Sequence, residues 1–190
     1  ADGGELMGLD ALREALPAWA RDIRLNVETI ARSQVLGEER LWSTMLAAAV
    51  AARNPYVVRE VEEEAQPHLS REVLEAVYSA SSVMAMNTVY YRARHLLAQA
   101  GIKAYEERTP RLRMQALKPK GSIPQADVEL WCLACSAVNG CASCLAGHER
   151  SLSASGVGEE EVHEALRIAA VVNAAAAVLD VVHLPEPVRT

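Results

Sequence analysis

Apolar residues recur every three or four positions along most of the chain, which is the spacing of one helical face. In the segment from 9 to 34 they stand at Leu9, Leu12, Leu16, Trp19, Ile23, Val27 and Ile30. Pro17 falls within this run, and proline is well tolerated in the first turn of a helix. The pattern therefore predicts two short helices, the second opened by Pro17.

The same periodicity predicts further helices over 38–53, 70–86, 87–100, 125–138 and 159–182. The stretches "SREVLEAV" and "VGEEEVHEAL" both place acids in a first helical turn, where the helix dipole favours them. The basic, Pro/Gly-rich stretch "LKPKGSIPQ" at 117–125 predicts a loop. We therefore predict an all-α protein divided by this loop into unequal parts.

The composition supports closely packed helices. Ala, Val and Leu supply most of the 51 % apolar content, and the 190 residues contain no Phe. Small side chains of this kind suit helices better than sheets. We expect one domain over 9–190, preceded by a disordered extension at 1–8, because the first residues are rich in Gly and acids.

The patterns of charge and hydrophobicity argue against nucleic acid and membrane as partners. The net charge is −6 and the basic residues are scattered among acids, unlike the basic stripe that binds nucleic acid. Every stretch of about 18 apolar residues is interrupted by charge, and "ADGGELMGLD" lacks the features of a signal peptide. We expect a cytoplasmic protein without membrane or nucleic-acid partners.

An internal repeat emerges when the chain is shifted on itself by 89 residues without a gap. This shift places Leu41 and Trp42 on Leu130 and Trp131. It also pairs Glu60 with Glu149 and aligns acids and alanines of 72–85 with those of 161–174. The interpretation is a duplication with a degenerate first half at about 9–116 and a second half at about 125–183.

All four cysteines lie between 132 and 144, so the chemistry falls in the second half. Asn139-Gly140 is a helix-stop signal, which puts Cys141 at the start of the next helix, where the dipole lowers a thiol pKa. Cys141, Cys144 and His148 follow at helical spacing on one face. Because His148 can act as the base for Cys144, we predict Cys144 as the attacking thiolate and Cys141 as the resolving thiol.

Two other interpretations of the cysteines stay open. A non-redox metal-binding module would use Cys132-x-x-Cys135 and Cys141-x-x-Cys144, although zinc sites usually separate such pairs by about 12 to 20 residues. Cys132 and Cys135 lie in a periodic apolar helix, where a reduced cysteine is an ordinary core residue. A structural disulfide between Cys141 and Cys144 would close a very short loop and constrain little.

Other Glu and His residues give weaker indications of a functional role. Glu129 lies on the helix before the Asn-Gly break and could approach the thiols, although a solvated glutamate is the commoner case. Glu149 points away from His148 on a helix, so we interpret it as structural. No partner at metal-ligand spacing accompanies the remaining histidines, which are His68, His95, His163 and His183.

The segment "ELWCLACSAVNGCASCLAGHE" resembles the active-site segment of the alkyl hydroperoxidase AhpD family, in which a Glu precedes a Cys-x-x-Cys and a His. The resemblance extends over roughly 9–182, through "LREALPAWARDIRLNV", "LWSTMLAAAVAARNP", "VMAMNTVYYR" and "LRMQALKPKGSIPQADVELW". It implies the AhpD-like fold, shared with carboxymuconolactone decarboxylases, and a homotrimer. In this family the residue before the peroxidatic cysteine is a second histidine, where this chain has Ser143.

The resemblance also implies the activity. It makes the chain a thiol peroxidase and disulfide reductase with Cys144 peroxidatic, Cys141 resolving, and Glu129 and His148 as proton relay. Ser143 can pass a hydrogen bond but cannot hold a proton near neutral pH. No bound cofactor or metal is expected, and no nucleotide-binding fingerprint is present.

The implied reductant is the dihydrolipoyl group of a dihydrolipoamide acyltransferase, kept reduced by lipoamide dehydrogenase, with possible onward transfer to the peroxiredoxin AhpC. An alternative within redox chemistry is a disulfide reductase adaptor for such a peroxiredoxin, with peroxide turnover incidental.

Overall fold

The computed structural model describes residues 6–119 and 121–182, and all its regular elements there are helical. The α-helices are α1 (Gly8–Ala15), α2 (Arg21–Ala31), α3 (Glu38–Ala52), α4 (Pro55–Ala65), α5 (Arg71–Gln99), α6 (Gln125–Val138), α7 (Ala142–Ala154) and α8 (Glu159–Val182). Short 3-10 turns occupy Ala18–Ala20, Gln66–His68 and Gln115–Leu117. The predicted all-α class is confirmed.

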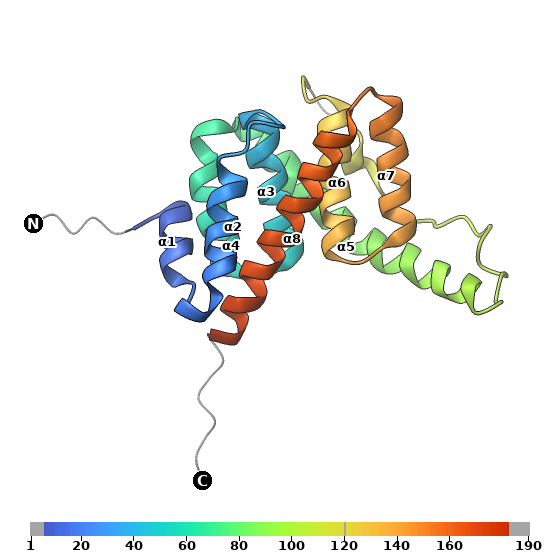
Figure 1. Ribbon diagram of the computed structural model, residues 1–190. Coiled ribbons are helices and arrows are strands. Elements are labelled where there is room, and N and C mark those ends of the chain that lie inside the picture. The colour runs from blue at the N-terminus through green and yellow to red at the C-terminus, as the bar shows by residue number, and fades with distance from the viewer. Residues whose placement is uncertain (1–5, 120, 183–190) are drawn as a thin grey trace, which may run out of the picture.

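The core is built where α3, α6 and α8 pack on one another (Figure 1). The alanines of α3 at 47–49 and those of α8 at 175–176 are buried, and such small side chains let helices approach closely. Trp131 of α6 is also buried, and its indole N–H donates to Ser43 Oγ of α3 at 2.9 Å. The central helices are thus held together by contacts between small residues and by one buried hydrogen bond.

The remaining helices lie on either side of this centre. α1, α2 and α4 form one side, while α5 and α7 flank α6 on the other (Figure 1). The C-terminal half of α5 and the segment after it extend beyond the neighbouring helices (Figure 1). This segment returns to α6 at Gln125, so it passes close to the cysteine-bearing half of the chain.

α8 is the one helix in 6–119 and 121–182 that is long and apolar enough to cross a membrane, judged by length and composition alone. A core helix meets the same criterion. α8 packs against α2, α3 and α6, and Ile168, Val172 and Leu179 are buried in those contacts. It is the central core helix of this fold.

Three local predictions need correction. The helices predicted at 70–86 and 87–100 are one continuous α5, since no Gly or Pro interrupts it. Trp19 is 68 % exposed rather than part of the apolar face. α4 was not predicted, although Asn54 caps it, Pro55 occupies its first position, and its buried residues recur at helical spacing.

The predicted boundary after residue 8 also shifts. Gly8 begins α1, is buried, and its backbone N–H donates to Glu60 Oε2 at 3.0 Å, so it belongs to the folded body. Residues 1–5 of the predicted extension, His183 and the last residues of the predicted domain lie outside the described residues.

The predicted first half contains α1 to α5, and at the predicted offset α3, α4 and α5 correspond to α6, α7 and α8 of the second half. The equivalence of individual residues is less regular. Glu60 is buried, whereas Glu149, its counterpart at the predicted offset, is exposed. The duplication stays a prediction.

Candidate active site

The cysteine pair is positioned by a tight turn between α6 and α7. Gly140 has a φ of 64°, a left-handed conformation that a residue without Cβ adopts freely. The Cys141 N–H donates to the Ser136 carbonyl at 3.1 Å and the Gly140 N–H to the Ala137 carbonyl at 3.2 Å. These two bonds form a Schellman motif, so the predicted helix stop at Asn139-Gly140 is confirmed.

Two arginines from other helices hold the same turn. Arg53, which follows α3, donates to the Asn139 side chain at 2.9 Å, and Arg92 of α5 donates to the Asn139 backbone carbonyl. Both cations thus contact Asn139, two positions before the N-cap residue of α7. The turn that carries the cysteines is therefore fixed by α3 and α5 as well as by its own backbone.

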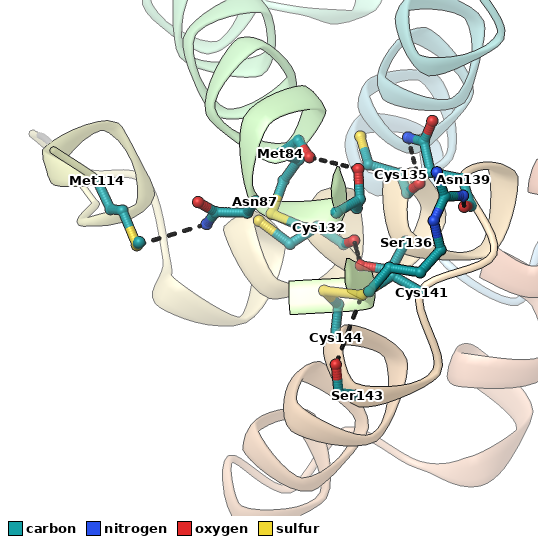
Figure 2. The surroundings of a disulfide bond; sticks show 12 residues. Met84, Asn87, Met114, Cys132, Cys135, Ser136, Asn139, Cys141, Ser143 and Cys144 are labelled. Carbon is teal, nitrogen blue, oxygen red and sulfur yellow. Dashed lines mark hydrogen bonds between the residues drawn. A yellow bond between two sulfur atoms is a disulfide. The ribbon is translucent and has the colours of Figure 1, made fainter. Parts of the chain in front are cut away.

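Cys141 is the N-cap of α7, and Cys144 lies in the first turn of that helix. The two side chains form a disulfide with a Cα–Cα distance of 5.3 Å (Figure 2). Cys141 is fully buried, whereas Cys144 retains 8 % of its surface. Ser143 Oγ lies 3.6 Å from the Cys141 sulfur. Of the two cysteines, only Cys144 has solvent-accessible surface.

The electrostatic setting favours a thiolate when this pair is reduced. The first N–H groups of a helix have no intrahelical acceptor, and the helix dipole is positive at that end. A free thiol has a pKa of about 8.5, which such a position lowers. Reduced Cys141 and Cys144 would therefore both be placed where negative charge on sulfur is stabilised.

Glu129 and His148 form a hydrogen-bonded pair across α6 and α7. Glu129 Oε2 lies 2.7 Å from His148 Nδ1, and Gln125 Nε2 donates to Glu129 Oε1 at 2.8 Å. Burial raises the pKa of the Glu129 carboxyl. The hydrogen bond and charge of His148, together with the Gln125 hydrogen bond, outweigh burial and leave that pKa below its ordinary value. Glu129 is thus poised as an anion that orients His148 through Nδ1.

A cavity of about 230 Å³ opens over Cys144. Ser143, Cys144, Gly147 and His148 of α7 form one wall of it. The opposite wall comes from α5 and from the segment that follows it, through Met84, Asn87, Tyr91 and Met114. A small molecule in this cavity would meet Cys144 and His148 together, in mainly apolar surroundings.

Cys132 and Cys135 are reduced and buried in α6, as predicted for core residues. Burial raises the pKa of the Cys135 thiol to about 11, although a hydrogen bond with Ser81 lowers it. Burial, with smaller contributions from Cys135 and Glu129, raises the pKa of Cys132 well above its usual range. Both stay protonated at neutral pH and are poor nucleophiles.

A metal centre finds no support among the described residues. No group of three or more His, Cys, Asp or Glu side chains comes together there in a way that could hold an ion. Of the remaining histidines, His163 is exposed, and His68 stacks on Trp42 with its Nδ1 3.4 Å from Glu38. His95 is half-buried on α5.

The structure brings together Glu129, Cys141, Ser143, Cys144 and His148, which the sequence singled out. It adds the α5 wall and Met114, which sequence reasoning missed. Helical spacing places Met84, Asn87 and Tyr91 on one face of α5. No local sequence pattern indicates that this face lies opposite α7.

The described residues place a Cys-x-x-Cys pair at a helix start, a Glu–His pair on the same two helices and a cavity over one of the two sulfurs. This arrangement suits the thiol chemistry of an oxidoreductase. The model of the carboxymuconolactone decarboxylase family matches residues 103–186. Relatives of nearly equal length include the alkyl hydroperoxide reductase AhpD of Mycobacterium tuberculosis (strain H37Rv). It is 42 % identical over 181 residues, covering 95 % of this chain and 99 % of the relative.

The alkyl hydroperoxide reductase AhpD of Streptomyces coelicolor is 44 % identical over 174 residues, covering 92 % of this chain and 96 % of the relative. The chain belongs to the AhpD family within the carboxymuconolactone decarboxylase superfamily.

Proposed function

We propose that this chain is a cytoplasmic, thiol-dependent alkyl hydroperoxide reductase that cycles Cys141 and Cys144 between dithiol and disulfide. Membership of the AhpD family makes it a peroxide-reducing oxidoreductase. The main support for the proposed cycle is that the two cysteines differ in burial and in access to the cavity. The sulfurs are bonded to each other, yet only Cys144 lines the cavity, while Cys141 is fully buried behind it.

The first step is oxidation of Cys144. His148 accepts the Cys144 thiol proton, and Glu129 stabilises the resulting imidazolium through Nδ1. The thiolate attacks the terminal peroxide oxygen, an S–O bond forms, and the O–O bond breaks. The departing alkoxide takes the proton from His148, which leaves an alcohol and a sulfenic acid on Cys144.

The second step forms the disulfide. Cys141 attacks the sulfenic sulfur and water leaves. Ser143 Oγ, which lies 3.6 Å from the Cys141 sulfur, can donate a hydrogen bond to the Cys141 thiolate in the reduced pair. A dihydrolipoyl dithiol then reduces the disulfide by two thiol–disulfide exchanges and is itself oxidised to the cyclic disulfide.

The reducing partners are part of the proposal. A lipoylated dihydrolipoamide acyltransferase presents the dithiol, and lipoamide dehydrogenase keeps it reduced. The peroxiredoxin AhpC accepts electrons from the reduced pair in this proposal. The partial exposure of Cys144 supports this arrangement, since an exchange partner must reach one sulfur of the disulfide.

A homotrimer completes the proposal. The projecting end of α5 and the residues after it expose large apolar side chains, which are Val89, Leu96, Leu97, Ile102 and Tyr105. A monomer rarely leaves such a group uncovered, and contact between copies would bury it. Light scattering coupled to size exclusion should give three times the chain mass, and a monomer would contradict the trimer.

The decisive experiment is dihydrolipoamide-dependent consumption of tert-butyl hydroperoxide by the wild type, Cys144→Ser and Cys141→Ser. Cys144→Ser should lose turnover. Cys141→Ser, mixed with peroxide before any dihydrolipoamide is added, should consume about one peroxide per chain and hold a sulfenic acid on Cys144 that dimedone traps, where the wild type forms the disulfide. Unchanged turnover in Cys144→Ser would refute the assignment of roles.

Cys135→Ala is the matched control, because this thiol is buried, reduced and outside the cavity. It should turn over at the wild-type rate. The same assay with a peroxiredoxin disulfide in place of peroxide distinguishes a peroxidase from a disulfide reductase adaptor. Much faster reduction of the protein disulfide would favour the adaptor.

A further inference from the structure

The buried amide of Asn87 is the unexplained feature of the cavity over Cys144. Asn87 lies midway along α5 and is only 5 % exposed. Its Nδ2 donates to the Met114 sulfur at 3.5 Å (Figure 2), and a thioether is a weak acceptor. Its Oδ1 has no hydrogen-bond partner among the described residues.

An unpaired buried amide oxygen is costly, because it loses its hydrogen bonds to water and gains none in the protein. Buried polar groups are satisfied in the large majority of cases, so an exception calls for a cause. Asn87 lines the same cavity as Cys144 and His148. A ligand in that cavity could supply the missing partner.

The surroundings limit what this ligand can be. The wall of the cavity opposite α7 carries Met84, Tyr91 and Met114 beside Asn87. At about 230 Å³ the cavity is below the roughly 300–1,000 Å³ of common ligand pockets. It suits a compact molecule with an apolar body and one small polar end.

We propose that Asn87 binds the peroxide group of the substrate, and that the substrates are hydroperoxides carrying a compact apolar group. This inference rests on the proposed function. Asn87 Oδ1 accepts a hydrogen bond from the terminal O–H, whose oxygen Cys144 attacks. The second N–H of Nδ2 donates to the oxygen bonded to carbon, where negative charge develops as the O–O bond breaks.

The hydrogen held by Asn87 stays on the oxygen that is transferred to sulfur, and the proton for the alkoxide comes from His148. The amide therefore exchanges no proton and orients the O–O bond toward the thiolate. Met84, Tyr91 and Met114 contact the organic group, which favours alkyl hydroperoxides over hydrogen peroxide.

The test uses reduced full-length protein and single-turnover oxidation of Cys144 by tert-butyl hydroperoxide. Asn87→Leu keeps the side-chain size and removes both hydrogen bonds, and Asn87→Ser is the second variant in case the first fails to fold. We expect the oxidation rate to fall about tenfold or more, as loss of a transition-state hydrogen bond does. Alkylation of Cys144 by iodoacetamide should keep its rate and pH profile, which a general disturbance of the site would change.

Thr44→Val is the matched control. Thr44 is buried in α3, its hydroxyl has no partner among the described residues, and it does not line the cavity. This variant should keep the wild-type oxidation rate. Met114→Ala should raise the rate with cumene hydroperoxide relative to tert-butyl hydroperoxide by opening the wall.

The outcomes are distinguishable. If peroxide oxidises Cys144 in the wild type and a folded Asn87 variant reacts at the same rate, the role of Asn87 is overturned. The proposed peroxidase function is then unaffected. Equal loss of the peroxide and iodoacetamide reactions would also overturn it. A wild type unreactive toward every hydroperoxide would overturn both proposals.

Discussion

Replacing Glu129 by Gln removes the negative charge beside His148 and keeps the size of the side chain. The pair is well defined, with 2.7 Å between Glu129 Oε2 and His148 Nδ1 and only 16 % and 18 % of the two side chains exposed. Glutamine can still form a neutral hydrogen bond there. The variant therefore isolates the contribution of the charge to the proton relay.

The expected magnitude follows from the kind of hydrogen bond that is lost. A hydrogen bond to a charged group contributes about 1.5–3 kcal/mol, and a neutral one about 0.5–1.5 kcal/mol. The loss should raise the barrier for ionising Cys144 by about 1.4 kcal/mol, which is roughly a tenfold slower reaction.

The assay is single-turnover oxidation of the reduced protein by tert-butyl hydroperoxide at pH 7. Glu149→Gln is the matched control, because Glu149 neighbours His148 on α7 but is exposed. It should react at the wild-type rate. A folded Glu129→Gln protein that reacts within about twofold of the wild type would refute the relay, since the charge would then contribute less than about 0.5 kcal/mol.

Three further predictions concern stability, measured by urea unfolding. The pKa of Glu129 is lowered in the folded protein, so its stabilising contribution is complete above its unfolded pKa of about 4.3 and is lost as pH falls through the folded value. The wild type should exceed Glu129→Gln in stability at pH 6, and a difference that persists at pH 2 would contradict this. Gly140→Ala places a Cβ at a φ of 64° and should lose about 1–2 kcal/mol, whereas Gly147→Ala within α7 should lose nothing. Arg40→Met leaves Asp127, which is 5 % exposed, without its cation at 2.7 Å and should lose about 2 kcal/mol. Arg71→Met, which breaks an exposed pair with Glu75, should have no measurable effect, and equal losses in the two arginine variants would show that burial of the pair is irrelevant.

The order and extent of most helices could be predicted from local signals. The apolar periodicity and Asn139-Gly140 placed the ends of α6 and the start of α7 correctly, because helix ends are set by residues within a few positions. The same rules were available for α4 through Asn54 and Pro55 and were missed there. The separation of α5 at residue 87 was wrong, since that boundary had no Gly, Pro or cap to support it.

The spacing of Cys141, Cys144 and His148 is a property of one helix, so the sequence by itself determined that these side chains share a neighbourhood. The pairing of Glu129 with His148 depends on how α6 and α7 pack on each other, because the local turn signal fixes the end of α6 but not the faces that the two helices share. Burial of Cys141 and access to Cys144 were decided only by tertiary packing. The same holds for the opposite wall of the cavity, because Asn87 lies more than 50 positions away along the chain. Local patterns specify helices, whereas the faces that helices present to one another follow from the whole core.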